Sequence, residues 1–272
     1  MKKKRIQLEK EKETLLIPLY SKSVENQKKI PIIVDEKAVE IVSRLNYDYS
    51  QLRIPKQTHV TLCMRAKQLD NYVKEFMQQN AECVVVHLGC GLDSRFIRVD
   101  NGKVEWYDLD YPEVIELRKS FYQESDRYHL IPSSVVEFKW MDNLIGKKGP
   151  FLFLAEGLFM YLREKEVKAL VLKLQKAFPG CQLIFDSYSA FTVKKIKNHP
   201  SIRKTDARIY WGIDNAHEIK KWKAGIQLRD EWYFTQSEDI NKLGVRYRLL
   251  FKLAGLFSVA RKAHRILVFQ LY

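Results

Sequence analysis

CVVVHLGCGLDSR, residues 83–95, is the stretch that decides the fold of this chain. Its first part, 83–88, is a short β-branched run, which is typical of a strand buried on both faces of a parallel sheet. Gly89 and Gly91 follow, and glycine lets the backbone turn tightly and approach a ligand closely. A helix after this turn would direct its free N–H groups at the same ligand. The stretch therefore predicts a strand, a ligand-binding turn and a helix in succession.

Similar runs predict the other strands of a single sheet. They lie at 103–109, 135–141, 151–156, 182–188, 230–235 and 264–272. Helical patterns are found at 57–77, 112–124 and 163–178. Because strands and helices alternate, we expect an α/β fold with a doubly wound, mostly parallel sheet, which the last strand closes as an antiparallel partner.

The chain of 272 residues shows no linker, so we expect one domain. Its expected parts are a helical N-terminal extension (1–80), a cofactor-binding core (81–187), a lid or acceptor insertion (188–235), and a C-terminal helix with the closing strand (236–272). No apolar run is long enough to span a membrane, which predicts a cytoplasmic protein. The four cysteines lack the close spacing of zinc or redox sites, so we expect free thiols and no metal.

Positive charge is in excess, with 47 Lys and Arg against 33 Asp and Glu. This balance favours anionic partners such as nucleic acid, phosphorylated molecules or an acidic membrane face. Residues 240–272 contain no acid, and such a basic segment would suit a membrane or an RNA backbone. Leu249, Leu250, Leu253 and Phe257 recur there at helical spacing, however, and we favour an amphipathic helix that covers the sheet.

An acidic residue at the end of the second strand adds to the glycine turn. Asp110 stands 21 positions after Gly89, where an acid accepts the ribose hydroxyls of an adenosine cofactor. Asp108 lies on the same face of the strand, but Asp110 is nearer the edge where ligands bind. Ser94 occupies the place of the third glycine that dinucleotide sites need, which argues against a pyrophosphate.

A sulfonium nucleoside carries an amino-acid tail in place of phosphates. Arg65 would bind its carboxylate, while Glu156 and backbone carbonyls near Gly89 would accept from its ammonium group. Asp142, just past the predicted third strand, would bind the adenine amino group. Each residue also has a simpler interpretation, as a surface helix residue, a solvated strand end or a helix cap. We expect Asp110, Asp142 and Glu156 to lie at the carboxyl ends of successive strands, and this convergence favours a shared site.

The chain resembles the leucine carboxyl methyltransferase superfamily. Within it, the resemblance is to the branch of bacterial O-methyltransferases similar to the tetracenomycin polyketide-synthesis enzyme. The resemblance is carried by ETLLIPLY (13–20), DEKAVEIV (35–42), MRAKQLD (64–70), VVVHLGCGLDSRFIRVDNG (84–102), WYDLDYPEVIELR (106–118), AEGLFMYL (155–162) and WGID (211–214). Ser94 departs from it, since threonine is more usual there, but the hydroxyl is kept.

The resemblance implies a Rossmann-like class I fold and S-adenosylmethionine as the cofactor, with S-adenosylhomocysteine as the product. Arg65 would hold the methionine carboxylate, Gly89 and Gly91 the turn, Asp110 the ribose, and Glu156 the methionyl amino group. The remaining residues expected at the cofactor site are His87, Leu88, Cys90, Asp93, Tyr111 and Gly157. His87, inside a buried strand, is expected to be a hydrogen-bonded core histidine and not a catalyst.

The methyl acceptor is left open by the sequence. Candidates for an acceptor pocket are Tyr161, Tyr188, Tyr210 and Trp211, although aromatic residues of 188–235 would serve equally as the core of the insertion. A carboxylate acceptor is already ionised and needs no general base, whereas a phenol gains from one. The sequence identifies no base, no other catalytic residue and no oligomeric state.

Three functions are compatible with these residues. We favour an O-methyltransferase that acts on a carboxylate or hydroxyl of a small molecule such as a polyketide-like metabolite. An RNA methyltransferase fits the charge, but AEGLFMYL (155–162) replaces the Asn-Pro-Pro-aromatic motif of base-amine enzymes, and Cys181 lacks the Pro-Cys context of cytosine-ring enzymes. A protein that binds S-adenosylmethionine without catalysis is the third.

Overall fold

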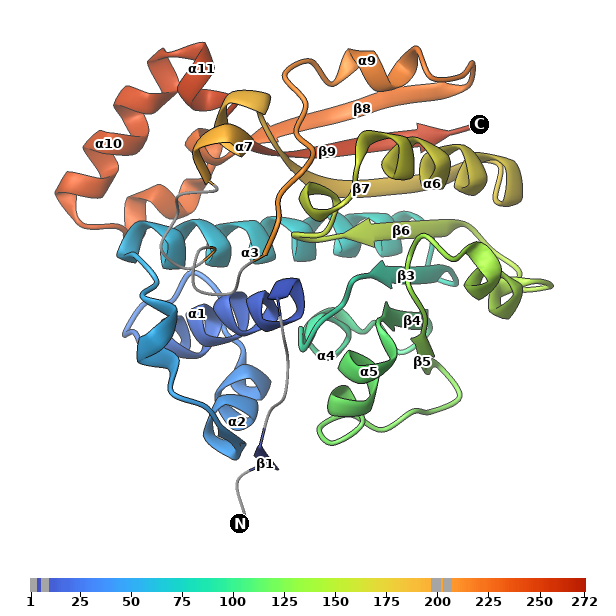
Figure 1. The fold of residues 1–272 in the computed structure, drawn as a ribbon, viewed down its shortest axis with the longest axis horizontal. Helices are drawn as coiled ribbons and strands as arrows, with labels where there is room; N and C mark the ends of the chain where they lie inside the picture. The colour runs from blue at the N-terminus through green and yellow to red at the C-terminus, as the bar shows by residue number, and fades with distance from the viewer. Residues whose placement is uncertain (1–3, 6–9, 197–201, 203–206) are drawn as a thin grey trace.

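The computed structural model describes residues 4–5, 10–196, 202 and 207–272, and it is organised around a seven-stranded sheet (Figure 1). The strand order is β5-β4-β3-β6-β7-β9-β8, and all neighbours are parallel except where β9 pairs with β7 and β8. The strands are β3 (Val84–Leu88), β4 (Glu105–Asp110), β5 (Tyr128–Pro132), β6 (Phe151–Ala155), β7 (Cys181–Tyr188), β8 (Ile226–Tyr233) and β9 (His264–Leu271). The predicted α/β fold and its antiparallel closing strand are confirmed.

Both faces of the central strand β3 are covered, as its apolar sequence predicts. Val84, Val86 and Leu88 belong to one hydrophobic cluster, while Val85 belongs to the cluster on the opposite face. All five residues of β3 are buried. Apolar side chains that alternate between the two faces, interrupted only by His87, are the pattern of a strand between two layers.

The helices form these two layers. On one face lie α1 (Leu16–Asn26), α2 (Glu36–Arg44), α3 (Lys56–Gln79) and α4 (Arg95–Val99), and α3 contributes Leu69 and Val73 to the same cluster as Val85. The opposite face is covered by α6 (Glu164–Ala177), whose apolar stripe includes Val167 and Leu170. Both long helices agree with the predicted ranges, but α5 (Pro112–Arg118) is shorter than its prediction.

The predicted strand at 135–141 is wrong. The third parallel strand is β5, which pairs with β4, and the 3₁₀ helix η3 (Phe138–Leu144) occupies most of the predicted range. Trp140, Met141 and Leu144 are its buried residues. These three residues share one side of a helical turn, although the same run also alternates like a strand. In so short an apolar segment, periodicity distinguishes a helix from a strand poorly.

The prediction that the C-terminal helix covers the sheet is also wrong. In α10 (Val245–Leu256), Leu249, Leu250 and Leu253 are 55%, 45% and 56% exposed, and Phe251 is the buried residue of the helix. Phe251 packs with Phe234, outside the main sheet clusters. Figure 1 shows α10 and α11 (Ser258–Arg261) at one edge of the molecule.

The remaining elements are short. They are β1 (Lys4–Arg5), η1 (Lys10–Leu15), β2 (Leu45–Asn46), η2 (Tyr49–Leu52), η4 (Phe159–Tyr161), α7 (Ala190–Ile196), α9 (His217–Lys220), η5 (Phe234–Gln236) and η6 (Glu238–Lys242). Residues 197–201 and 203–206 of the predicted insertion lie outside the described residues. Within the described chain, none of the helices combines the length and apolar character required to cross a membrane.

Candidate functional site

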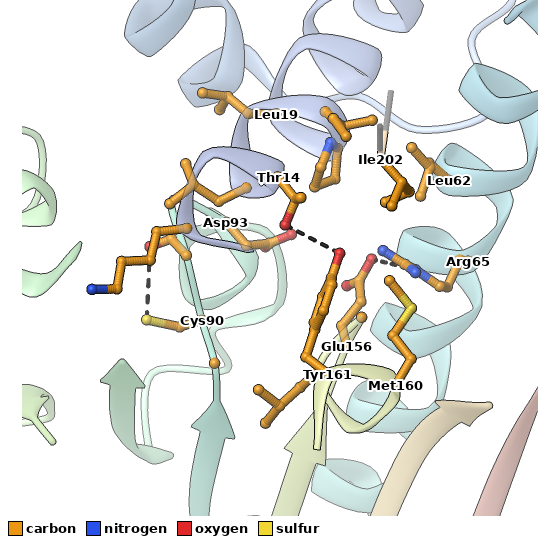
Figure 2. A pocket seen from close by; sticks show the side chains of 18 of the residues that line it. Thr14, Leu19, Leu62, Arg65, Cys90, Asp93, Glu156, Met160, Tyr161 and Ile202 are labelled. Atoms are coloured by element: carbon orange, nitrogen blue, oxygen red, sulfur yellow. Dashed lines mark hydrogen bonds and ion pairs between the residues drawn. The ribbon is translucent and has the colours of Figure 1, made fainter. Parts of the chain in front are cut away.

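A cavity of about 1070 Å³ opens where the carboxyl ends of β3, β4 and β6 meet. Most of the residues predicted for the site line it: Arg65, His87, Gly89, Cys90, Gly91, Asp93, Asp110, Tyr111, Glu156, Gly157, Tyr161, Tyr188 and Tyr210. In Figure 2, Cys90 and Asp93 lie at one end, Leu62 and Ile202 lie at the other, and Glu156 is between them. The cavity therefore has two distinct ends.

The glycine turn after β3 requires glycine for two reasons. Gly89 and Gly91 have φ angles of 65° and 53°, a left-handed conformation that side chains disfavour. A Cβ at Gly89 would lie 2.9 Å from Leu158 Cδ1, and one at Gly91 would lie 3.3 Å from Leu15 Cβ. The amides of Gly89 and Cys90 both donate to the Leu109 carbonyl, which fixes the turn against β4.

Asp110 is held at the rim of β4 by two backbone amides. Its carboxylate accepts the N–H groups of Gly91 and Tyr111, both at 2.7 Å. Burial raises the pKa of Asp110 to about 6. A carboxylate offers about four acceptor positions, so this group retains capacity for two ribose hydroxyls. Asp108 instead lies in the core, 1% exposed, and pairs with Arg118.

Arg65 and Glu156 place a buried cation and a carboxylate in the cavity wall, and Asp186, which does not line the cavity, holds Arg65 from behind. Arg65 donates through Nε to Glu156 Oε1 and through Nη1 to Asp186 Oδ2, each at 2.9 Å, and Glu156 Oε2 also accepts from Arg95 at 2.5 Å. Burial alone would raise the pKa of Glu156, but the two guanidinium groups hold that pKa below its usual range. A fixed cation beside a fixed anion matches the zwitterionic end of an amino acid.

The wall beneath the glycine turn is a second ionic cluster. Asp93 pairs with Lys22 and, at 3.0 Å, with Arg98, and Arg98 also reaches Asp35 and Asp70 at 2.8 and 2.7 Å. Burial opposes the ionisation of Asp93, but Arg98 and Lys22 hold its pKa well below the usual range. Because these charges are paired with one another, they hold this wall of the cavity in place. Asp93 positions the wall through its pairs with Lys22 and Arg98.

Two residues of the site were missed by the sequence analysis. Asp186, in β7, accepts from Arg65, from the Gly157 amide at 2.5 Å and from His264 Nε2 at 2.8 Å. His264, in β9, lines the cavity and stacks on Tyr188 with ring centroids 4.1 Å apart. An acidic residue inside the apolar run QLIFDSY (182–188) was the signal that pointed to Asp186.

Residues from the N-terminal extension close the cavity from above, and we call 12–22 the roof. Lys12, Thr14 and Leu15 line the cavity together with residues of α1. Tyr161 donates through its hydroxyl to Thr14 Oγ1 at 3.2 Å, a contact that Figure 2 shows bridging the roof and η4. Lys12 also pairs with Glu113 at the start of α5. The roof is thus tied to two sides of the cavity.

The far end of the cavity, which we call the acceptor lobe, is apolar with a cationic edge. Its residues are Leu62, Met160, Tyr188, Thr192, Lys195, Ile196, Ile202, Arg208 and Tyr210. In Figure 2, Leu62 and Ile202 lie above Arg65, Met160 lies below it, and all three lie to the right of Glu156. Lys195 and Arg208 supply positive charge, and no acidic residue belongs to this part of the described lining.

Three of the predicted site residues lie elsewhere. Leu88 is fully buried in the core, because its side chain points to the face of β3 away from the cavity. Trp211 is 6% exposed and packs against both Phe159 and Phe185 as part of the core.

Asp142 was assigned to adenine on the premise that a strand ends just before it. The residue is exposed in η3 and does not line the cavity. Ser133 and Ser134 follow the true third strand and line the cavity instead. His87 is buried, as expected, but only its Nε2 has a hydrogen-bond partner, Arg95 Nη1 at 3.4 Å, while its Nδ1 lies 3.6 Å from Asp108 without a hydrogen bond.

Comparison with known proteins finds sequence similarity to methyltransferases. A family model described as leucine carboxyl methyltransferase matches residues 19–175. The tetracenomycin polyketide synthesis O-methyltransferase of Streptomyces glaucescens is 34% identical over 83% of this chain and 83% of its own length. An S-adenosyl-L-methionine-dependent methyltransferase of Gibberella zeae is 26% identical over 91% of this chain and 90% of its own.

Among solved structures, that of a putative methyltransferase from Thermobifida fusca has a TM-score of 0.56 and 12% identity, and the match covers 94% of each chain. At this identity the likeness concerns the fold alone.

Proposed function

The chain belongs to the leucine carboxyl methyltransferase family, and from this premise we propose that it transfers a methyl group from S-adenosylmethionine to an oxygen atom of a small molecule. The observation that carries the proposal is the single cavity that joins the glycine turn, Asp110 and the Arg65–Glu156 pair to the acceptor lobe. Two ligands in one enclosed space is the arrangement that direct transfer between them requires.

The residues at the cofactor end match the parts of a sulfonium nucleoside. Asp110 would accept the ribose hydroxyls, and the Arg65 guanidinium would bind the carboxylate of the amino-acid tail, whose ammonium group lies toward Glu156. When bound, the cofactor supplies a methyl group activated by positive sulfur. The roof would exclude water from this group, since η1 and α1 contribute side chains to the same cavity.

The charge of the acceptor lobe favours an anionic acceptor. Lys195 and Arg208 would attract a carboxylate, while Met160, Ile202 and Tyr210 would contact an apolar body. A carboxylate is ionised near neutral pH and needs no base before it accepts a methyl group. An aromatic or otherwise apolar carboxylic acid is therefore our first candidate, and a phenol is the second.

The proposal is tested by incubating the protein with S-adenosylmethionine and matched pairs of aromatic carboxylic acids and phenols. Mass spectrometry then follows S-adenosylhomocysteine and the methylated acceptor, and mild alkali distinguishes a hydrolysable ester from a stable ether. We expect ester formation. Lys195→Gln combined with Arg208→Gln should raise KM for the acid about tenfold through loss of charge pairing. Lys168→Gln, at an exposed position of α6, is the control for loss of a surface charge.

Two outcomes would contradict the proposal at different levels. Failure to bind S-adenosylmethionine would remove the proposed cofactor. Tight binding without turnover of any acid or phenol would favour a protein that binds the cofactor without catalysis.

A further inference from the structure

The edge of the molecule formed by α10 and α11 carries a row of exposed apolar side chains, which we call the C-terminal surface. Its members are Val245 (61% exposed), Leu249 (55%), Leu250 (45%), Leu253 (56%), Leu256 (78%), Phe257 (64%) and Val259 (65%). Scattered exposed leucines are ordinary, but a contiguous set on one helix and the turn after it marks an interaction surface.

The helix is fixed in the orientation that exposes this row. Phe251 is buried against Phe234 and Ile240, and Tyr247 packs on the same cluster. The apolar positions Leu249, Leu253 and Leu256 therefore lie on the opposite side of the helix, where their three- and four-residue spacing places them together. The helix has two apolar faces, and the fold uses one of them.

Basic side chains accompany the exposed row. Arg246, Lys252 and Arg261 are exposed, Arg248 and Lys262 are half-buried, and no acidic residue occurs from 240 to 272. Lys242 donates to the Pro31 carbonyl at 3.0 Å, which brings the loop with Lys29 and the 66% exposed Ile30 to this side of the molecule. Apolar and cationic side chains are thus interleaved on one face.

This combination distinguishes between possible occupants. A second copy of the chain would place these cations against identical cations across a twofold axis, and residues 240–272 contain no carboxylate to offset them. RNA would satisfy the cations, but single strands stack on aromatic side chains, and the exposed row consists mostly of leucine and valine. An anionic bilayer accepts both kinds of side chain, with apolar groups at the boundary of headgroups and acyl chains and Lys or Arg at the phosphates.

We propose that α10 and α11 dock on the surface of a membrane rich in anionic phospholipid. The row of leucines, with Phe257, would enter the interface, and Arg246, Lys252 and Arg261 would bind the headgroup phosphates. Each such cation contributes about fivefold to partitioning at a charged surface, and salt weakens that contribution. The docking is independent of methyl transfer, because the C-terminal surface lies outside the residues that line the cavity.

The test is sedimentation of the full chain with vesicles of phosphatidylcholine alone or mixed with phosphatidylglycerol. We expect binding to the mixed vesicles only, weaker at high salt. Leu249→Gln with Leu253→Gln should lower the partition coefficient at least about tenfold, and Arg246→Gln with Lys252→Gln about thirtyfold. Ile145→Gln is the matched control, at a 75% exposed position directly after η3, and it should bind like the wild type.

Thermal melting and S-adenosylmethionine binding of the same variants check that the fold is intact, since all the substituted side chains are exposed. Equal binding of the leucine variant and the wild type would overturn the proposal, as would wild-type protein that ignores anionic vesicles. A dimer that the leucine variant dissociates, without vesicle binding, would assign the surface to a second copy. Binding to a single-stranded RNA homopolymer, without vesicle binding, would assign it to nucleic acid.

Discussion

At the scale of single residues, Asp110 makes the proposed cofactor site sensitive to pH. Burial raises its pKa to about 6, so it is mostly ionised at neutral pH and mostly protonated near pH 5. The carboxylate is the form that accepts both ribose hydroxyls. We therefore expect the Kd for S-adenosylmethionine, measured by calorimetry, to rise about tenfold between pH 7 and pH 5.

Asp110→Asn is the control for this pH dependence, because it cannot titrate. It should bind weakly at every pH, and a wild-type Kd that does not change over the same range would contradict the assignment.

The same carboxylate affects stability in the opposite direction, because lower pH weakens cofactor binding but raises the free energy of unfolding. Its folded pKa lies above the unfolded value, so the folded state takes up a proton as pH falls through about 6, and the cost of the buried charge disappears.

The residues that could be predicted from the sequence are those with local signals. Asp110 ends one buried strand and Glu156 follows another, which places both at the binding edge of a parallel sheet without knowledge of the fold. Asp186 and His264 are 78 positions apart and meet through the antiparallel pairing of β7 with β9. No spacing rule predicts that contact, so the sequence marks Asp186 as an unusual acid in an apolar strand but does not reveal its pairing with His264.

At the scale of elements, the turn after β6 is shaped to leave room for Arg65. Gly157 has a φ of 63°, and a Cβ there would lie 3.2 Å from Arg65 Nη2. Glu156 and Asp186 hold Arg65 in place, so the guanidinium can yield to a new Cβ only by weakening these two ion pairs. Gly157→Ala should therefore displace the guanidinium and lower S-adenosylmethionine affinity about tenfold, as a lost charge-assisted hydrogen bond does.

Gly180→Ala separates this effect from backbone strain. Gly180 has a similar φ of 82°, and nothing lies within 4 Å of a Cβ at this position. Both variants should lose about 1–2 kcal/mol of unfolding free energy in urea titrations, the cost of a left-handed alanine. The interpretation fails if the two variants bind the cofactor equally well.

The sequence predicted elements with strong periodicity and failed where the pattern was short. The long helices α3 and α6 were found because many residues repeat one period, and β3 was found because its β-branched run is bounded by glycine. The run at 135–141 is too short for its alternation to exclude a helix. This one error is the reason that the sequence analysis wrongly placed Asp142 in the site. In α10 the helix was predicted correctly, but no sequence pattern states which of two apolar faces packs inward.

At the scale of the whole molecule, the roof joins the N-terminal extension to the sheet across the cavity. It is tied to η4 by the Thr14–Tyr161 hydrogen bond and to α5 by the Lys12–Glu113 pair. We expect cofactor binding to slow amide hydrogen exchange in peptides from 12–22, at least about tenfold, because ligand contacts add to the cost of opening. Peptides from α6, on the opposite face, provide the internal control, and unchanged exchange in the roof would show that it takes no part in binding.

The roof also leads us to expect an order of events for the proposed reaction. If the cofactor lies beneath 12–22, it would enter while the acceptor lobe is empty, so the acceptor would arrive second and the methylated molecule would depart first. The spent nucleoside would leave last, and its release would compete with the chemical step as the slowest step of the cycle. An enzyme of this kind would retain its by-product and would be inhibited by it in competition with the methyl donor. The supply of donor relative to by-product in the cell would then govern its output.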